Sequence, residues 1–256
     1  MNKTHRPFQR ILSVWYRHFR VYTSHLLSNG FPPFFEPLIF LAGIGLGLGQ
    51  IIQEMDGIPY LDFLASGLCI STAMMTAAYE CTFGSFIRLE YEKIYDGILA
   101  APIALPEMVI GEILWAGSKG FFFSFAVISV VSLFGLLHTP RVVVIPFVGF
   151  LTGVFFASLS LFITSFVRNI DHFSFYMTGF LSPMFFFSGI VFPTSSLPAW
   201  LIPITEILPL THAVRLARGI LFERHHLLLW DSLFLGAGIF VFTMLSIRGI
   251  EKRMIQ

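Results

Sequence analysis

Long apolar runs, separated by short polar segments, constrain the fold of this chain more than any other feature. Six runs are long enough to cross a bilayer, which takes about 20 apolar residues. They lie near residues 31–52, 60–87, 110–137, 142–167, 173–192 and 227–247. Lipid offers the backbone no hydrogen-bond partners, so each run must be helical. The sequence therefore predicts an all-α, polytopic membrane protein with six transmembrane helices.

The composition indicates a single membrane domain. Hydrophobic residues make up 55% of the chain and charged residues 12%, whereas soluble domains carry roughly 25% charged residues. No polar stretch is long enough to build a separate soluble core, so residues 1–256 are predicted to form one transmembrane domain. The net charge of +1 gives no indication of nucleic-acid binding. Cys69 and Cys81 share one apolar run and are too far apart along a helix for a disulfide.

The positions of Lys and Arg predict the orientation of the chain in the membrane. An even number of spans places both termini on one side, and that side holds most of the cations. These cations are Lys3, Arg6, Arg10, Arg17, Arg20, Arg88, Lys93, Arg168, Arg248, Lys252 and Arg253. The opposite side is predicted to hold Arg141, Arg215, Arg218 and Arg224. Both termini are therefore expected in the cytoplasm.

Residues 1–29 are predicted to form a basic amphipathic helix at the cytoplasmic surface of the membrane. Its apolar stripe is Phe8, Ile11, Leu12, Trp15, Phe19, Tyr22 and Leu26. Arg10, Arg17 and Arg20 lie off this stripe. Such a helix either anchors and orients the protein or also adds to a surface that binds a partner.

Residues 88–105, between the second and third runs, are predicted to form a short charged helix. Apolar side chains recur at helical spacing, at Tyr91, Ile94, Tyr95 and Ile98. Glu90, Glu92, Lys93 and Asp96 occupy the other faces. This helix is too short to span the bilayer. It is either a surface that receives force from a soluble partner or an interfacial helix that rests on the headgroups.

Residues 193–224, before the last run, break the helical pattern. Pro193, Pro198, Pro203 and Pro209 prevent a continuous crossing helix. We predict a re-entrant hairpin of two short helices entering from the outer face, with Thr211 as a candidate N-cap of the second. Irregular backbone at membrane depth needs shelter by protein or by a water-lined cavity. This segment, which also holds Trp200 and His212, is therefore where an outer gate is expected.

Glycines and ionisable residues inside the runs suggest two further features. Gly43/Gly47 and Gly45/Gly49 form two overlapping Gly-x-x-x-Gly pairs, which permit close packing of a helix from this chain or from a second copy. Glu36, Glu112 and Lys119 are expected to form an intramembrane polar cluster near the cytoplasmic mouth. The alternative for that cluster is that each side chain snorkels and is satisfied by its neighbours.

The sequence contains no catalytic or metal-binding arrangement. Ser188 lacks the Gly two residues before it that an intramembrane serine protease carries, and no intramembrane His offers itself as a base. His172, His225 and His226 make no ligand set. No Gly-x-x-x-x-Gly-Lys-Ser/Thr occurs, so any ATP-driven mechanism needs its ATPase on a separate polypeptide.

Several tracts, in order along nearly the whole chain, resemble the type-2 ATP-binding cassette exporter permeases, in particular the nodulation-factor (lipo-oligosaccharide) exporter branch. No single tract is diagnostic, but their order and spacing are specific. The matching tracts are Phe35-Glu36-Pro37-Leu38, residues 60–67, Tyr79-Glu80 through Arg88, Tyr95-Asp96-Gly97 through Pro102, Gly111-Glu112 through Trp115, residues 187–193, residues 197–200 and residues 209–212.

This resemblance implies a permease subunit in the bacterial inner membrane, with six spans and cytoplasmic termini. It implies a homodimer with two copies of a nucleotide-binding ATPase, which would hold the ATP and Mg, and no cofactor on this chain. By position, residues 90–104 would be the coupling helix, the Arg10–Arg20 helix would join its footprint, and residues 193–219 would be the outer gate hairpin. Cargo would be amphipathic or lipid-linked, such as a lipo-oligosaccharide, glycolipid, lipid or drug. The alternative is a secondary transporter or channel that needs no ATPase.

Overall fold

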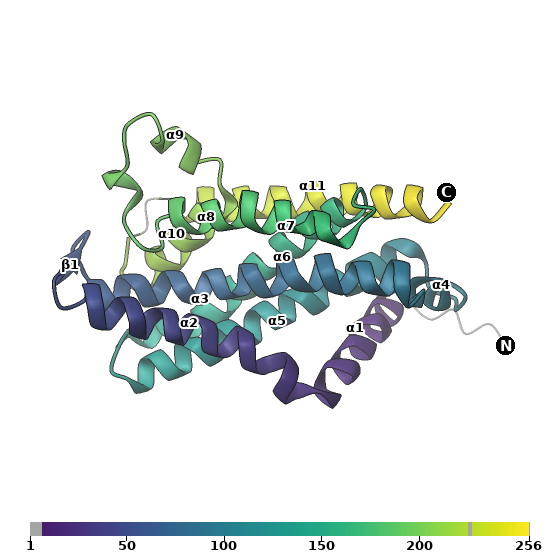
Figure 1. Ribbon diagram of the computed structural model, residues 1–256, viewed down its shortest axis with the longest axis horizontal. Helices are drawn as coiled ribbons and strands as arrows, with labels where there is room; N and C mark the ends of the chain where they lie inside the picture. Colours follow the sequence, from purple (N-terminus) through teal and green to yellow (C-terminus); the bar gives the residue numbers. More distant parts are fainter. Residues whose placement is uncertain (1–6, 225–226, 256) are drawn as a thin grey trace.

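The computed structural model describes residues 7–224 and 227–255, and these form helices joined by short loops and one small hairpin (Figure 1). Lys3, Arg6, His225 and His226 lie outside the described residues. The hairpin pairs β1 (Glu54–Met55) with β2 (Ile58–Pro59) in antiparallel register. It marks one end of the molecule, called here the hairpin end. The opposite end, where α4 (Ile94–Leu99) lies, is called the α4 end.

A long central helix organises the rest of the molecule. It runs from Tyr60 to Tyr91 as α3 (Tyr60–Tyr79) followed by the π-helical segments η1 (Glu80–Gly84) and η2 (Ile87–Tyr91). Most of α3 is buried, because four helices pack against it. They are α2 (Leu26–Leu48), α5 (Leu105–Leu133), α6 (Ile145–Thr164) and α10 (Pro209–Leu221).

Four helices are long and apolar enough to cross a membrane: Tyr60–Tyr91, Leu105–Leu133, Pro140–Thr164 and Leu228–Met254. They correspond to the second, third, fourth and sixth predicted spans. The helix Pro140–Thr164 begins in the 3-10 turn η3 (Pro140–Val144) and continues as α6. The helix Leu228–Met254 is part of α11 (Leu228–Ile255). α11 packs against α6 and α10, and much of its surface is exposed.

The first and fifth predicted spans are helical. That they cross the membrane remains a prediction. The first is α2, which contains Pro32, Pro33 and Pro37. The fifth follows the turn η4 (Ile170–His172) and consists of α7 (Phe173–Tyr176), η5 (Met177–Leu181) and α8 (Ser182–Phe187). It stops at Phe187, not near residue 192, because Gly189 has φ +81° and turns the chain.

Helix α1 (Pro7–Ser24) is amphipathic, and its packed face overlaps the predicted apolar stripe only in part: Trp15 and Tyr22 pack on Trp115 of α5. Val14 and His18, one turn apart, are buried against α5, where Val14 meets Gly111. Trp15 Nε1 donates to Ser118 Oγ at 2.9 Å and fastens the same face. Phe8, Leu12, Phe19 and Leu26 stay exposed. Packing on α5 therefore buries Val14 and His18 and holds Trp15, whereas Phe8, Leu12 and Phe19 point outward.

Helices α5 and α6 cross in backbone contact at small residues. A Cβ on Gly120 would lie 2.7 Å from the Gly149 carbonyl oxygen and 3.2 Å from Gly153 Cα. Small residues at such crossings permit close approach in the way that Gly-x-x-x-Gly pairs do in membrane helices. Gly149 and Gly153 are such a pair, which the sequence reasoning missed.

Gly120→Leu is expected to lower the free energy of unfolding by about 3 kcal/mol or more, because a well-packed crossing cannot accept the side chain. Gly236→Leu in α11 is the matched control, since a Cβ there meets nothing within 4 Å. Both changes carry the same difference in helix propensity. Thermal unfolding of the purified proteins in detergent measures the difference, and equal melting temperatures would contradict the crossing described above.

The glycine-rich end of α2 divides into two faces. Cβ atoms on Gly45 and Gly49 would lie 2.7 Å and 3.3 Å from Leu61 Cδ2, so this pair packs on α3 of the same chain. Gly43 and Gly47 have nothing within 4 Å of such a Cβ. One Gly-x-x-x-Gly pair is therefore used inside the described chain, and the other remains open.

The hairpin end also carries the predicted outer segment. It contains η6 (Thr194–Ser196), α9 (Ile202–Thr205) and α10, with irregular backbone between them (Figure 1). The prediction that Thr211 caps the second helix is wrong. Pro209 begins α10, the N-cap is Leu208, and Thr211 lies within the first turn. Proline is favoured at the first helical position, so the helix begins at Pro209 and its N-cap lies three residues before the predicted one.

Candidate functional site

Five ionisable side chains gather at the α4 end and are called here the charge cluster: His18, Glu80, Arg88, Glu112 and Lys119. Arg88 bridges the two carboxylates, with Nη1 2.9 Å from Glu80 Oε1 and Nη2 2.8 Å from Glu112 Oε2. Lys119 Nζ lies 2.8 Å from Glu80 Oε2, and His18 Nε2 lies 2.9 Å from Glu112 Oε1. The cluster joins α1, the central helix and α5.

Burial makes the mutual pairing of these charges necessary. Glu112 is only 1% exposed, and Arg88, Glu80 and Lys119 are largely covered. Each carboxylate faces a cation, so the charges balance when His18 is neutral. Ser85 Oγ also donates to Glu112 Oε2 at 3.1 Å. This bond meets part of the hydrogen-bonding capacity that a buried ion pair needs, whereas Arg88 Nε and, apart from its ion pair with His18, Glu112 Oε1 have no hydrogen-bond partner among the described residues.

Tyr22 covers the Lys119 side of the charge cluster. Lys119 Nζ lies 4.6 Å from the centre of the Tyr22 ring, a cation–π distance. Burial, with the Glu80 carboxylate nearby, raises the pKa of Tyr22 to about 12. The phenol therefore stays neutral next to the paired charges.

The residues of the predicted polar cluster, Glu36, Glu112 and Lys119, lie in different surroundings. Glu112 and Lys119 do lie close together, but through Glu80 and Arg88 rather than directly. Glu36 makes no ion pair with them; it is exposed on α2 and lines a cavity with Lys119. His18 and Arg88 were missed. The signal for Arg88 was its spacing of eight residues from Glu80, about two helical turns on the same face.

The predicted charged helix of residues 88–105 is two elements, not one. Residues up to Tyr91 belong to the central helix, and Tyr91 is 65% exposed rather than part of a buried stripe. The chain reverses at Lys93, which has φ 53°, and α4 begins at Ile94. Tyr95 and Ile98 anchor α4 in the core, whereas Asp96 and Gly97 are exposed. α4 therefore presents a polar face outward on two buried anchors.

Some of the predicted coupling residues are exposed, whereas Glu90 is ion-paired within the chain. Glu92, Lys93, Asp96 and Gly97 are exposed, and a Cβ on Gly97 meets nothing within 4 Å. Glu90 is instead held within the chain, with Oε1 2.8 Å from Nη2 of Arg253 on α11. Arg253 also donates to the Thr164 carbonyl, so the ends of α6, α11 and the central helix are tied together.

Arg10 and Arg17 on α1 were also predicted to contact a partner. Arg10 Nη1 lies 3.3 Å from Glu107 Oε1, and Glu107 Oε2 accepts the Ala104 N–H at 2.8 Å at the start of α5. Arg17 lines a cavity of about 320 Å³ beside the charge cluster. The structure thus gives Arg10 a role in fastening α1 next to the loop that follows α4.

A cavity of about 540 Å³ opens between α2 and the central helix, next to Lys119. Part of its wall is polar and part is apolar. The polar residues are Ser28, Asn29, Glu36, Ser71, Thr72, Thr76 and Lys119. The apolar wall includes Phe40, Met75 and Phe185. Such a lining suits a molecule with a polar head and an apolar tail.

The predicted outer-gate residues have distinct surroundings. His212 is fully buried, with Nδ1 2.7 Å from Asp231 Oδ1 on α11 and Nε2 2.9 Å from the Glu206 carbonyl oxygen. This contact fastens α10 to α11. Pro193 lines a pocket, Pro209 begins α10, and Trp200 is exposed at the tip of the segment. The pairing of His212 with Asp231 was not predicted, because Asp231 lies in another helix.

Comparison with known proteins identifies relatives over most of the chain. Residues 9–222 match the family described as ABC-2 type transporter. Nodulation protein J of Sinorhizobium fredii is 35% identical, over 83% of this chain and 81% of that protein. The Bradyrhizobium diazoefficiens protein of the same name is 34% identical over the same shares. Inner membrane transport permease YadH of Escherichia coli is 22% identical over 82% of each chain.

Proposed function

Because the chain belongs to the ABC-2 type transporter family, we propose that it is the permease subunit of an exporter for an amphipathic or lipid-linked molecule, driven by a partner ATPase. The family makes the chain a membrane-embedded transport permease and not an enzyme. Export from the cytoplasm or inner leaflet, the cargo class and the partner stoichiometry are parts of the proposal.

The exposed face of α4 carries the proposal. α4 follows directly on the central helix, and its anchors Tyr95 and Ile98 are buried beside it. A push on Asp96 or Gly97 would therefore reach the most deeply buried helix of the chain. Rigid-body displacement of packed helices is a common way in which such a force changes access to a transport route.

The arrangement in the membrane is also proposed. The α4 end would face the cytoplasm, with six spans and both termini on that side. The exposed Phe8, Leu12 and Phe19 of α1 would rest in the interface between water and lipid. The segment 193–224 at the hairpin end would enter from the outer face. The charge distribution along the sequence supports this orientation.

Two copies of the permease would pair, and each would bind one copy of the ATPase, which holds ATP and Mg. The open Gly43/Gly47 face of α2 is free to approach a second copy. The cavity beside α2 would then lie at the join between the copies. Its mixed lining supports a lipo-oligosaccharide, glycolipid, lipid or drug as cargo. The resemblance to the nodulation-factor (lipo-oligosaccharide) exporter branch favours the first of these.

Reconstitution in proteoliposomes tests the proposal. We expect transport of a fluorescent lipo-oligosaccharide to require the permease, the ATPase and ATP together. The ATPase is identified as the protein that co-purifies with the permease and has a P-loop in its sequence. Transport by the permease alone, driven by an ion gradient, would instead show an ATPase-independent secondary transporter.

Filling the cavity is expected to slow transport in the same assay. Met75→Trp places a bulky ring into the cavity wall and should lower the initial transport rate about tenfold, because cargo and indole compete for the same volume. ATPase co-purification should be unchanged. Met244→Trp on the exposed face of α11 is the matched control. A Met75→Trp protein that transports as fast as Met244→Trp would exclude this cavity from the route.

A further inference from the structure

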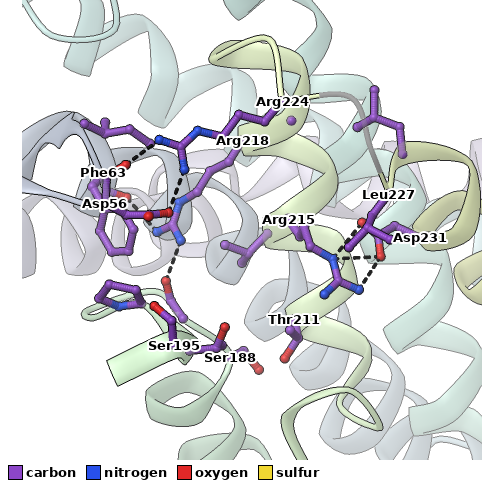
Figure 2. Close-up of a pocket in the computed structure, with 17 residues that line it drawn as sticks. Asp56, Phe63, Ser188, Ser195, Thr211, Arg215, Arg218, Arg224, Leu227 and Asp231 are labelled. Atoms are coloured by element: carbon purple, nitrogen blue, oxygen red, sulfur yellow. Dashed lines mark hydrogen bonds and ion pairs between the residues drawn. The ribbon is translucent and has the colours of Figure 1, made fainter. Parts of the chain in front are cut away.

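A third pocket, of about 290 Å³, lies at the hairpin end, away from α4 and from the two cavities described above. Its walls come from α3 at Phe63, the turn at Ser188 and Gly189, the helix α10 and the start of α11. Figure 2 shows Arg215, Arg218 and Arg224 above the hydroxyls of Ser188 and Thr211.

The arginines that line this pocket differ in their ion pairs, and Arg215 pairs with Glu206 as well as with an aspartate, its Nη1 lying 2.8 Å from Glu206 Oε1. Its three arginines face two aspartates, Asp56 and Asp231. Arg224 Nη1 lies 2.6 Å from Asp56 Oδ2, and Arg215 Nη2 lies 2.7 Å from Asp231 Oδ1. No described carboxylate lies within ion-pair distance of the remaining Arg218. Arg218 is therefore the one arginine of this pocket that has no carboxylate at ion-pair distance among the described residues.

Arg218 is fixed in place by neutral acceptors. Its Nη1 donates to the Gly189 carbonyl at 2.6 Å, its Nη2 to the Phe63 carbonyl at 2.9 Å and its Nε to Ser66 Oγ at 3.2 Å. The guanidinium carbon lies 3.5 Å from the centre of the Phe63 ring. Burial lowers the pKa of the Arg218 guanidinium, as expected for a cation without a counter-ion. These bonds hold the turn at Gly189 against α3, so the pocket is preformed.

Two buried hydroxyls in the pocket have no hydrogen-bond partner among the described residues. They are Ser188 Oγ and Thr211 Oγ1, on residues that are 2% and 3% exposed. They come from separate elements, the turn after α8 and the first turn of α10. A buried donor without an acceptor is costly, and few remain in native proteins. An acceptor placed in this pocket would satisfy both.

We propose that this pocket binds a phosphate group, whose oxygens accept hydrogen bonds from Ser188 and Thr211 and whose charge balances Arg218. A tetrahedral oxyanion offers several acceptors in different directions, which suits hydroxyls on two separate elements. Water would satisfy the hydroxyls but would leave the charge of Arg218 uncompensated. Val214, Leu227 and Leu228 supply an apolar wall for the carbon beside a phosphate ester. Phospholipid headgroups and free inorganic phosphate share this chemistry.

The Ser188→Ala/Thr211→Val double variant tests the site. The two hydroxyls have no partner within the described chain, so the variant should melt no lower than the wild type in phosphate-free detergent. Added inorganic phosphate should raise the melting temperature of the wild type and, at equal ionic strength, that of the Ser129→Ala control on α5. The double variant should bind phosphate about tenfold or more weakly, since two charge-assisted hydrogen bonds are lost.

A second arm distinguishes the source of the phosphate. Native mass spectrometry counts the phosphatidylglycerol molecules that each protein retains after stepwise delipidation. A deficit of the double variant in this arm identifies a lipid headgroup, and a deficit only with inorganic phosphate identifies the free ion. Equal behaviour of the variant and the wild type in both arms would overturn the proposal. So would a lower melting temperature of the phosphate-free variant, because the hydroxyls would then be bonded within the protein.

Discussion

Gly97→Trp is expected to abolish ATP-driven export, to below about a hundredth of the wild-type rate, in a permease that remains folded and inserted. Gly97 lies on the exposed face of α4, and a Cβ there has nothing within 4 Å. The indole therefore has room within the isolated permease and stands out from its surface. A partner that packs closely on α4 would be displaced by this ring, since a preformed interface tolerates little added volume. ATP-dependent transport in proteoliposomes measures the effect.

Gly97→Ala is the matched control for this experiment. A methyl group in the same position adds helix propensity and little volume, so transport should stay within about twofold of the wild type. Co-purification separates loss of docking from misfolding: the Trp variant should elute as a folded permease without the ATPase. If the Trp variant binds the ATPase and transports normally, α4 does not receive the force, and the proposed coupling falls.

The order of helices was predictable, because a bilayer demands long apolar helices and the sequence shows them without interruption. Four of the predicted spans are helices of sufficient length and hydropathy. Their ends were less predictable. The central helix continues to Tyr91 through π-helical turns, and the fifth apolar run ends as a helix at Phe187. In both places a local backbone feature decides the boundary, and residue type alone gives little indication of it.

The residues of the candidate sites were harder to predict from the sequence than the helices were. A polar face in this segment was predicted, since Glu90, Glu92, Lys93 and Asp96 lie off the apolar positions. The partners of the ionisable residues were not. Glu90 was expected on the surface, but Arg253 on a distant helix holds it, and Glu112 is paired with His18 of α1. Pairs of this kind depend on which helices become neighbours, and helical spacing within one segment carries no such information.

Removal of the bridging cation of the charge cluster should have the largest effect on stability. Arg88→Met leaves Glu80 and Glu112 buried with one cation fewer, and an uncompensated buried charge typically costs about 3–5 kcal/mol. For a chain of this size that loss corresponds to a melting temperature about 6 °C lower or more. Exposed Arg20→Met on α1 is the matched control and should melt like the wild type. Fluorescence-detected size exclusion after heating measures the melting temperature of each of these proteins.

The double variant Arg88→Met/Glu112→Met separates charge from packing in the charge cluster. It removes one cation and one carboxylate, so Glu80 keeps Lys119 and His18 faces a thioether. Replacing both partners of a buried ion pair by apolar side chains of similar size is often neutral. The double variant should therefore melt several degrees above Arg88→Met alone. If the two changes simply add, Arg88 and Glu112 do not act as a pair, and the stability would come from the packing of α1 on α5 instead.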